Sequence, residues 1–459
     1  MHLLGWLHWK SAVGKEYFVR SRHAALLIVP ALLALALCGC GAAKGNVSGP
    51  PLMAASIARS SAPSPQSAAS ADAFVDSIGV NTHLTFIDHV YYTDYPAIDS
   101  LLVASGIRHI RDGAFMVGPW YGQRLNDLAG LGVKSDLFLP PSVSDSALKS
   151  FAASVSPAVE RYEGPNELDG SDPSFAKTLQ TFVPHVAALL KADPRTAKLP
   201  FIAPSFETYP SYAAVGSLAP SVNYGNIHNY YGGYNPGTGG WGAAGLGGNY
   251  GSLSYAIAHA RLVSLSLPII STETGYCDGG PPNASPAPQA VVTRYLPRLF
   301  LEQFFAGISR TYLFEFADEP GTGTFTSCGL LTARATPKPQ YAALKNLITL
   351  LSDKGPAFQA GKLSYGISGI TADTRQAVLE KRNGTFYLAI WQEVLGAQPG
   401  TTNLLTTAPQ SVHISFNPKR TVTRYAFTDQ GDLPVKATSP RVTSLEFPVD
   451  DHVTILQIR

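Results

Sequence analysis

Charged residues are scarce in this chain: they make up 14% of its 459 residues and leave a formal net charge of only +2. The sequence has no basic stripe, so it lacks the electrostatic footprint of a nucleic-acid-binding protein. After the first 40 residues, no apolar run reaches the length that spans a bilayer. These absences exclude nucleic acid as a partner. Export and substrate binding have to be inferred from other features of the sequence.

The sequence also lacks motifs that mark particular chemistries. No His-Glu-x-x-His motif occurs and the histidines are scattered, so we expect no metal site. A Gly-x-Ser-x-Gly elbow, which a serine hydrolase of the α/β type requires, is missing. No glycine fingerprint for a dinucleotide follows the first predicted strand. We therefore expect a protein that works without a cofactor.

The N-terminal segment, residues 1–40, has the features of an export signal. Its basic residues between positions 10 and 22 precede an apolar run over residues 24–37, which is too short to span a bilayer comfortably. The run ends in Leu37-Cys38-Gly39-Cys40, which resembles a bacterial lipobox and would make Cys40 the lipidated residue. A cleaved secretory signal is the alternative. In both cases we expect export, either to the bacterial cell envelope with attachment to the membrane only through a lipid, or by secretion.

Composition divides the rest of the chain into three parts. Residues 41–72 are rich in Ala, Ser, Gly and Pro and lack aromatic residues, so we expect a disordered tether. Residues 73–352 alternate short apolar runs with amphipathic stretches, which is typical of a parallel sheet with crossover helices. Residues 353–459 carry short apolar runs separated by turn signals and no helical pattern, which predicts a small β-sandwich. We expect Trp391 in the core of that β-sandwich.

Eight strand candidates in the middle part predict a (β/α)₈ barrel. A doubly wound open sheet is the structural alternative. The candidate strands cover residues 77–83, 107–111, 134–139, 159–164, 199–204, 224–228, 267–272 and 310–316, and the clearest helical patterns cover residues 175–192, 290–306 and 341–351. In the last part, the candidate strands cover residues 366–370, 376–381, 385–392, 411–416, 421–427, 441–447 and 452–458.

Two glutamates end predicted barrel strands and carry the functional hypothesis. Glu167 closes the segment Tyr162-Glu163-Gly164-Pro165-Asn166-Glu167, and Glu273 lies in Ser271-Thr272-Glu273-Thr274. Strand ends of a parallel barrel meet at one rim, so the two carboxyl groups can face each other. Two facing carboxyl groups are the minimum needed to cleave a glycosidic bond, because one protonates the leaving oxygen and the other attacks the sugar or activates water.

These residues resemble clan A glycoside hydrolases, which are retaining (β/α)₈ enzymes whose fourth strand ends in Asn-Glu and whose seventh ends in Glu. The C-terminal β-sandwich is similar to that of family 39 members. The resemblance implies that Glu167 is the general acid/base and Glu273 the nucleophile. It also implies supporting roles for Asn166, which would bind the sugar 2-hydroxyl, for His228 and Tyr230 after the sixth strand, and for Arg111 beside the nucleophile.

Three further residues are candidates for substrate contact. His83 ends the first predicted strand and is either a sugar contact or a hydrogen-bonded core histidine. Glu315 lies in the eighth strand, in a run that departs from the family pattern because it lacks the tryptophan that usually forms the floor of the sugar site. Trp241 belongs to the glycine-rich segment 231–250, which we interpret as an aromatic lid over the site; a disordered surface loop is the alternative.

The cysteines outside the signal, Cys277 and Cys328, follow the seventh and eighth predicted strands. Adjacent strands bring these loops to the same rim, and an exported protein meets an oxidising compartment. We therefore predict a disulfide between them, with two separate buried thiols as the alternative.

The sequence thus predicts an exported, monomeric retaining glycosidase that acts on an oligo- or polysaccharide. The competing hypothesis is a surface carbohydrate-binding protein that keeps the barrel without turnover. The sugar, the linkage and the choice between exo and endo action are left open.

Overall fold

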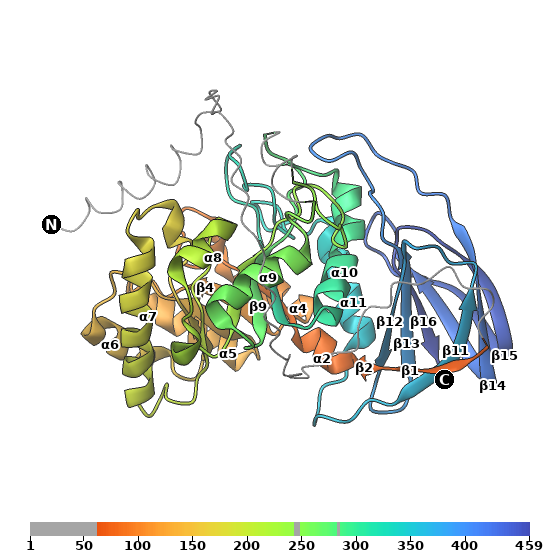
Figure 1. The fold of residues 1–459 in the computed structure, drawn as a ribbon, viewed down its shortest axis with the longest axis horizontal. Helices are drawn as coiled ribbons and strands as arrows, with labels where there is room; N and C mark the ends of the chain where they lie inside the picture. The colour runs from red at the N-terminus through yellow and green to blue at the C-terminus, as the bar shows by residue number, and fades with distance from the viewer. Residues whose placement is uncertain (1–61, 243–247, 282–284) are drawn as a thin grey trace, which may run out of the picture. The chain divides into compact units, whose positions relative to one another are not determined.

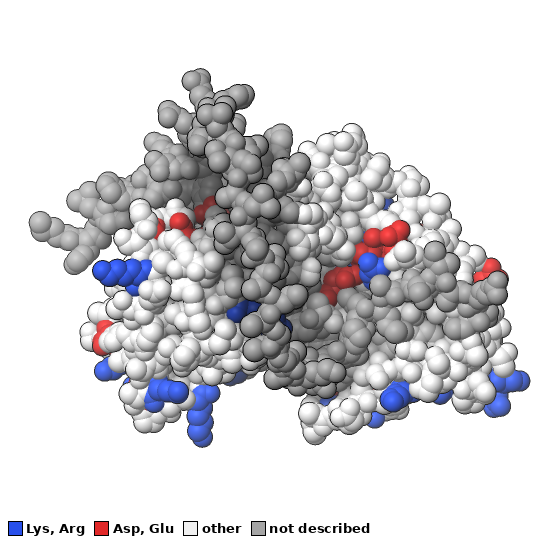
Figure 2. All heavy atoms as spheres, in the orientation of Figure 1, with Lys and Arg blue, Asp and Glu red and all other residues white. Residues whose placement is uncertain are grey.

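The computed structural model describes residues 62–242, 248–281 and 285–459. The predicted signal, Cys40 and most of the predicted tether lie outside the described residues. Within the described ranges, no helix is long and apolar enough to cross a membrane. On the face shown in Figure 2, charged side chains of both signs are scattered over a mostly uncharged surface, as the low charge content requires.

The larger part of the described chain is built on an eight-stranded parallel sheet, which confirms the predicted (β/α)₈ barrel. The strands pair in the order β7-β6-β5-β4-β3-β10-β9-β8, and a parallel bridge between Ile202 and Tyr224 joins the two ends of this order. The strands are β3 (Ile78–Asn81), β4 (His109–Gly113), β5 (Lys134–Phe138), β6 (Val159–Glu163), β7 (Phe201–Ile202), β8 (Gly225–His228), β9 (Ile269–Thr274) and β10 (Ile308–Leu313).

Helices alternate with these strands, and their apolar spacing explains why they pack on the barrel (Figure 1). In α7 the buried residues Leu179, Val183, Val186 and Leu190 recur every three or four positions, which places them on one face. The helices are α2 (Ala71–Asp76), α3 (Val90–Thr93), α4 (Tyr95–Ser105), α5 (Pro119–Gly130), α6 (Asp145–Val155), α7 (Phe175–Ala192), α8 (Tyr209–Val215), α9 (Leu253–Ser264), α10 (Gln289–Phe305) and α11 (Pro339–Leu351).

The C-terminal domain is a mostly antiparallel sheet, with strand order β1-β11-β14-β16-β13-β12-β2 and β15 paired to β14. Its inner face forms a separate apolar core that includes Leu363, Leu388, Ile414 and Leu456. The strands are β1 (Ser64–Ser67), β2 (Ala69–Ser70), β11 (Lys362–Ser368), β12 (Thr374–Glu380), β13 (Phe386–Gln392), β14 (Gln410–Ala426), β15 (Val435–Val449) and β16 (Thr454–Ile458).

Two details of this domain differ from the sequence prediction. The predicted strands 411–416 and 421–427 are halves of the single strand β14, whose first half pairs with β11 and whose second half pairs with β16. The last residues of the predicted tether are not disordered: β1 pairs with β11 and β2 with β12 (Figure 1). Small polar residues can still form an edge strand where a neighbouring strand supplies the backbone partners, and composition does not report that neighbour.

A buried ion pair joins the barrel to the C-terminal domain. Arg298 of α10 donates hydrogen bonds to both carboxylate oxygens of Glu393, which follows β13, and both side chains are fully buried. The indole nitrogen of Trp391 donates to the same carboxylate at 2.6 Å. Trp391 is completely buried, as predicted, and it packs with the barrel helices rather than with the inner core of the sheet.

The predicted disulfide between Cys277 and Cys328 is present. It links the segments that follow β9 and β10, and the amide of Asp278 adds a hydrogen bond to the carbonyl of Ser327 at 2.9 Å. The link closes a loop of 51 residues beside the strand that carries Glu273.

We predict that replacing both cysteines, Cys277→Ser with Cys328→Ser, lowers the free energy of unfolding by about 2–4 kcal/mol, because the crosslink restricts the unfolded chain. Urea unfolding of the double variant and of the wild type measures the difference. Reduction of the wild type with a thiol should reproduce it. Two free thiols in the native wild-type protein would contradict the crosslink.

Candidate active site

Glu167 and Glu273 reach the carboxyl end of the barrel from opposite sides. Glu273 lies on β9, where every residue is buried, and Glu167 follows β6 in a left-handed backbone conformation with φ of 43°. The amide of Glu167 donates to the hydroxyl of Ser205 at 3.2 Å, which fixes this turn. A carboxylate oxygen of Glu167, one of Glu273 and a ring nitrogen of His228 all lie within 4.8 Å of one another. The two carboxyl groups therefore face each other at short range, as a pair of carboxyl groups that flank a glycosidic bond must.

Arg111, on β4, is the cation beside Glu273, and its side chain is 2% exposed. Its guanidinium donates to both oxygens of Glu163 at 2.7 and 2.8 Å and to Glu273 Oε1 at 2.7 Å. It also donates to Asn81 Oδ1 at 2.9 Å and to Asn166 Oδ1 at 2.6 Å. One guanidinium thus positions residues from β3, β6, the segment after β6, and β9.

The surroundings of Glu273 favour its ionised form. Burial would raise the pKa of Glu273, but the charges of His228 and Arg111 outweigh burial and lower the pKa below its ordinary value. The hydroxyl of Tyr230 contributes to this lowering by donating to Glu273 Oε2 at 2.9 Å. The negative charge of Glu273 is therefore stabilised by three residues that the sequence predicted: Arg111, His228 and Tyr230.

His228 lies between the two glutamates, with Nδ1 at 2.7 Å from Glu167 Oε1 and 3.6 Å from Glu273 Oε2. Its Nε2 is 2.9 Å from Oγ1 of Thr272, whose own proton goes to Asn226 Oδ1 at 2.7 Å. Nε2 therefore donates to Thr272, and Nδ1 lies where it can share a proton with the carboxyl group of Glu167. Burial would lower the pKa of His228, but the charges of Glu273 and Glu167 raise it, which agrees with a cationic ring.

His83 and Glu315 form a second pair at the same rim, with His83 Nε2 at 3.2 Å from Glu315 Oε2. Burial raises the pKa of Glu315 to about 7 although His83 opposes it. Burial also works against protonation of His83, yet Glu315 and Glu319 raise the pKa of His83 to about 9.

Aromatic rings connect this second pair to Glu273. The His83 ring lies 5.6 Å from Phe314, Phe314 lies 6.4 Å from Phe325, and Phe325 lies 5.9 Å from the Tyr230 ring. Phe325 is 44% exposed. Sequence reasoning missed Phe325, because it lies in a loop without a recognisable pattern.

Trp241 packs within its own loop in this structure. Its ring lies against Gly232 and Gly251 and edge-on to Tyr250, and its amide donates to the carbonyl of Tyr250 at 2.8 Å. The interpretation of this segment as a lid stays a prediction, and residues 243–247 within it lie outside the described residues.

Sequence reasoning also missed the polar residues that hold the site from below. Asn81, Asn226 and Thr272 are buried and hydrogen-bond to Arg111, to Glu163 and to His228. Asn226 precedes His228 by two positions on β8, and residues two apart on a strand face the same side, so this spacing was a usable signal. Thr272 gave no such signal, since it directly precedes Glu273 and a register irregularity separates the pairs beside it.

The barrel and the C-terminal β-domain share their overall fold with solved structures of glycoside hydrolases. No protein-family model and no curated protein matches the sequence. Among solved structures, a family 39 glycoside hydrolase from the gut symbiont Bacteroides cellulosilyticus WH2 is similar, with a TM-score of 0.57 and 14% identity over 84% of this chain and 82% of that chain. An alpha-L-arabinofuranosidase from Thermotoga maritima, in an arabinose complex, has a TM-score of 0.50 and 10% identity over 79% of this chain and 89% of that chain.

The raised pKa of His228 predicts a pH-dependent contribution to stability. A group whose pKa rises on folding stabilises the fold fully below its unfolded pKa, about 6.5 for histidine, and loses that contribution as pH rises through the folded pKa. The free energy of unfolding should therefore differ more between wild type and His228→Asn at pH 6 than at pH 9, by about 1.4 kcal/mol for each unit of the shift. Urea unfolding at both pH values measures this, with the exposed His185→Asn as control. A difference independent of pH would contradict a cationic His228.

Proposed function

We propose that this protein is an exported retaining glycoside hydrolase that cleaves β-linked glycosides or polysaccharide by double displacement. The observation that carries the proposal is the pair Glu167 and Glu273, whose facing oxygens lie within 4.8 Å in unlike surroundings. Glu273 is buried against Arg111 and Tyr230, whereas the side chain of Glu167 is 29% exposed. Unlike surroundings for two carboxyl groups support different roles in acid–base chemistry.

In the first step, ionised Glu273 attacks the anomeric carbon and Glu167 protonates the leaving oxygen. The proton for this step is held between Glu167 Oε1 and His228 Nδ1, which lie 2.7 Å apart. The resulting glycosyl ester removes the charge of Glu273. Glu167, which has given its proton to the leaving group, can then accept a proton from the water that hydrolyses the ester.

The remaining groups at the rim fit a sugar ring. Asn166 uses its oxygen to accept from Arg111, which leaves its amide nitrogen as a donor for the 2-hydroxyl. His83, whose side chain is 21% exposed, can offer a polar atom to a hydroxyl group, with the fully buried Glu315 behind it. The rings of Phe325 and Phe314 offer an apolar surface nearby. An oligo- or polysaccharide is thus the substrate class that we propose.

The export part of the proposal rests on the sequence of residues 1–40. The apolar run and the lipobox-like Cys40 support a lipid-anchored protein of the bacterial cell envelope, with a cleaved signal as the other route out of the cell. The disulfide between Cys277 and Cys328 is compatible with an oxidising compartment.

We predict that Glu273→Ala abolishes turnover. Glu167→Ala should lose about 10²–10⁴-fold in rate on substrates with poor leaving groups and much less on activated aryl glycosides, because these need little protonation. Azide should restore turnover of aryl glycosides by Glu167→Ala and give a β-glycosyl azide. Rates on a panel of aryl glycosides and oligosaccharides test this, with Glu446→Ala on β15 as a control. Equal loss on both substrate types would contradict the acid role of Glu167.

A mechanism-based inhibitor that traps the nucleophile of retaining glycosidases separates the enzyme from a non-catalytic carbohydrate-binding protein. We expect covalent labelling of the peptide that contains Glu273. Binding of glycans without any labelling or turnover would favour the carbohydrate-binding alternative.

A further inference from the structure

The segment that follows β8 carries active-site residues at its start and touches the C-terminal domain further on. It begins at Asn229, whose amide donates to the carbonyl of Glu273 at 3.2 Å and whose carbonyl accepts from Thr274 at 2.7 Å. Tyr230 comes next and donates to Glu273. Five residues after Tyr230, the side chain of Asn235 meets the domain that follows the barrel. The position of Tyr230 thus depends on what holds the chain on both sides of it.

Glu393 of the C-terminal domain holds this segment at its far end. Its Oε1 accepts from the side-chain amide of Asn235 at 2.8 Å and from the backbone amide of Gly237 at 3.0 Å. The same carboxylate accepts two bonds from Arg298 and one from Trp391. Glu393 is fully buried, and although burial opposes it, the charge of Arg298 and these bonds keep its pKa below the ordinary value. A buried, ionised carboxylate with five donors is a rigid anchor.

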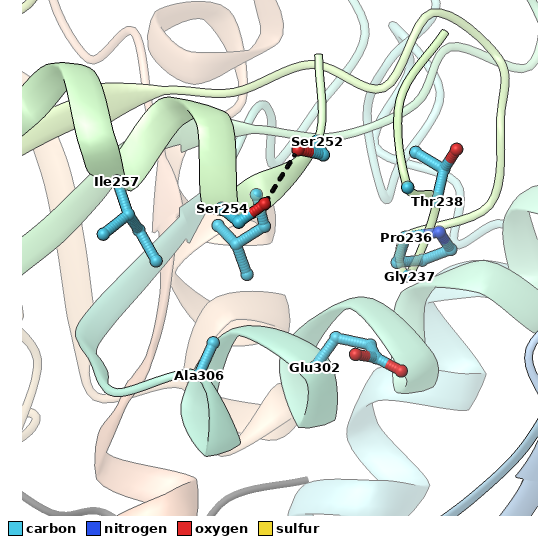
Figure 3. Close-up of a pocket in the computed structure, with 10 residues that line it drawn as sticks. Pro236, Gly237, Thr238, Ser252, Ser254, Ile257, Glu302 and Ala306 are labelled. Atoms are coloured by element: carbon cyan, nitrogen blue, oxygen red, sulfur yellow. Dashed lines mark hydrogen bonds between the residues drawn. The ribbon is translucent and has the colours of Figure 1, made fainter. Parts of the chain in front are cut away.

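A pocket lies beside the part of the segment that Glu393 holds. A cavity of about 460 Å³ lies between residues 236–239, the start of α9 and the side of α10. Figure 3 shows Glu302 of α10 and Ala306, the residue after α10, on one side of this space and Ser254 and Ile257 of α9 on the other, with Gly237 on the side of Glu302. Burial and the neighbouring Glu393 raise the pKa of Glu302 to about 8, so at neutral pH Glu302 adds no second negative charge beside Glu393.

Close packing adds to this contact with the C-terminal domain. A Cβ atom on Gly233 would lie 3.2 Å from the amide nitrogen of Gly400 and 3.5 Å from Pro399. A Cβ atom on Gly237 would lie 2.4 Å from Cγ of Glu393, so this position accepts only glycine without a shift. On the barrel side, Tyr276 donates to the carbonyl of Tyr234 at 2.8 Å. The segment is therefore fitted between the barrel rim and the second domain.

We propose that Glu393 is a positioning residue for the active site: by fixing Asn235 and Gly237, the C-terminal domain holds Tyr230 at hydrogen-bonding distance from Glu273. This role rests on the proposed function of Glu273 as nucleophile. The hydroxyl of Tyr230 helps to keep Glu273 ionised, so loosening the segment should weaken that bond and disfavour the ionised nucleophile. The C-terminal domain is then part of the catalytic unit rather than an appended module.

Gly237→Ala tests the proposal, because its Cβ would collide with Cγ of Glu393 and force the segment and this side chain apart without removing Arg298 or Glu393. Gly239→Ala is the matched control, since it lies two residues further on and its Cβ would have no atom within 4 Å. We expect Gly237→Ala to lower kcat by about 10–100-fold, as a misplacement of roughly 1 Å can do. The acidic limb of its kcat/KM profile should move to higher pH. Gly239→Ala should stay within twofold of wild type with an unchanged limb.

Hydrogen exchange of the peptide over residues 229–241 gives a readout that does not depend on activity. Exchange should be faster in Gly237→Ala and unchanged in Gly239→Ala. If wild type has no glycosidase activity while exchange follows this pattern, the proposed function fails and the anchor stands. If Gly237→Ala does not fold, Asn235→Ala removes two side-chain hydrogen bonds to Glu393 without a clash and should show the same changes. Wild-type exchange and an unshifted acidic limb in a folded variant would overturn the proposal.

Discussion

One buried cation, the guanidinium of Arg111, organises the carboxyl end of the barrel. It donates to groups from four parts of the chain, including both oxygens of Glu163 and one of Glu273. Two buried carboxylates repel each other and lose hydration on burial. Arg111 supplies the opposite charge and hydrogen bonds to both, and the side-chain oxygens of Asn81 and Asn166 accept its remaining N–H groups. The positions of the Glu163 and Glu273 carboxylates follow from their bonds to Arg111.

A second glutamate at the rim, Glu315, has a pKa shifted in the opposite direction from that of Glu273. Glu315 is as buried as Glu163, but its nearest cation is a histidine, and the pKa of Glu315 is raised to about 7. Glu273 has an arginine, a cationic histidine and a tyrosine hydroxyl around it, and its pKa is lowered. Environment rather than residue identity thus makes Glu273 favour its ionised form and Glu315 favour its protonated form.

The sequence could predict the barrel because its strands and helices have strong local signals, and each of the eight strands formed close to where the apolar runs lie. It could point to Glu167, Glu273, Arg111, His228 and Tyr230 as neighbours because barrel strand ends share a rim, and the structure brings them together. It could not predict β1 and β2, since an edge strand owes its existence to a partner remote in sequence. Glu393 was missed for a similar reason: its contacts cross between domains, and no local pattern marks them.

The pairing of β1 and β2 with the C-terminal sheet has a consequence for how the chain assembles. Ser64 lies opposite Tyr365 and Ala69 opposite Leu379, so the two ends of the described chain meet in one domain with the whole barrel between them. Contacts between residues so far apart in the sequence form late, and they make folding slow. Residues 64–70 precede the barrel in the chain and their partners β11 and β12 follow it, so these pairings cannot form until the chain beyond the barrel is present. The C-terminal domain is therefore completed last, because its sheet contains strands from both ends of the described chain.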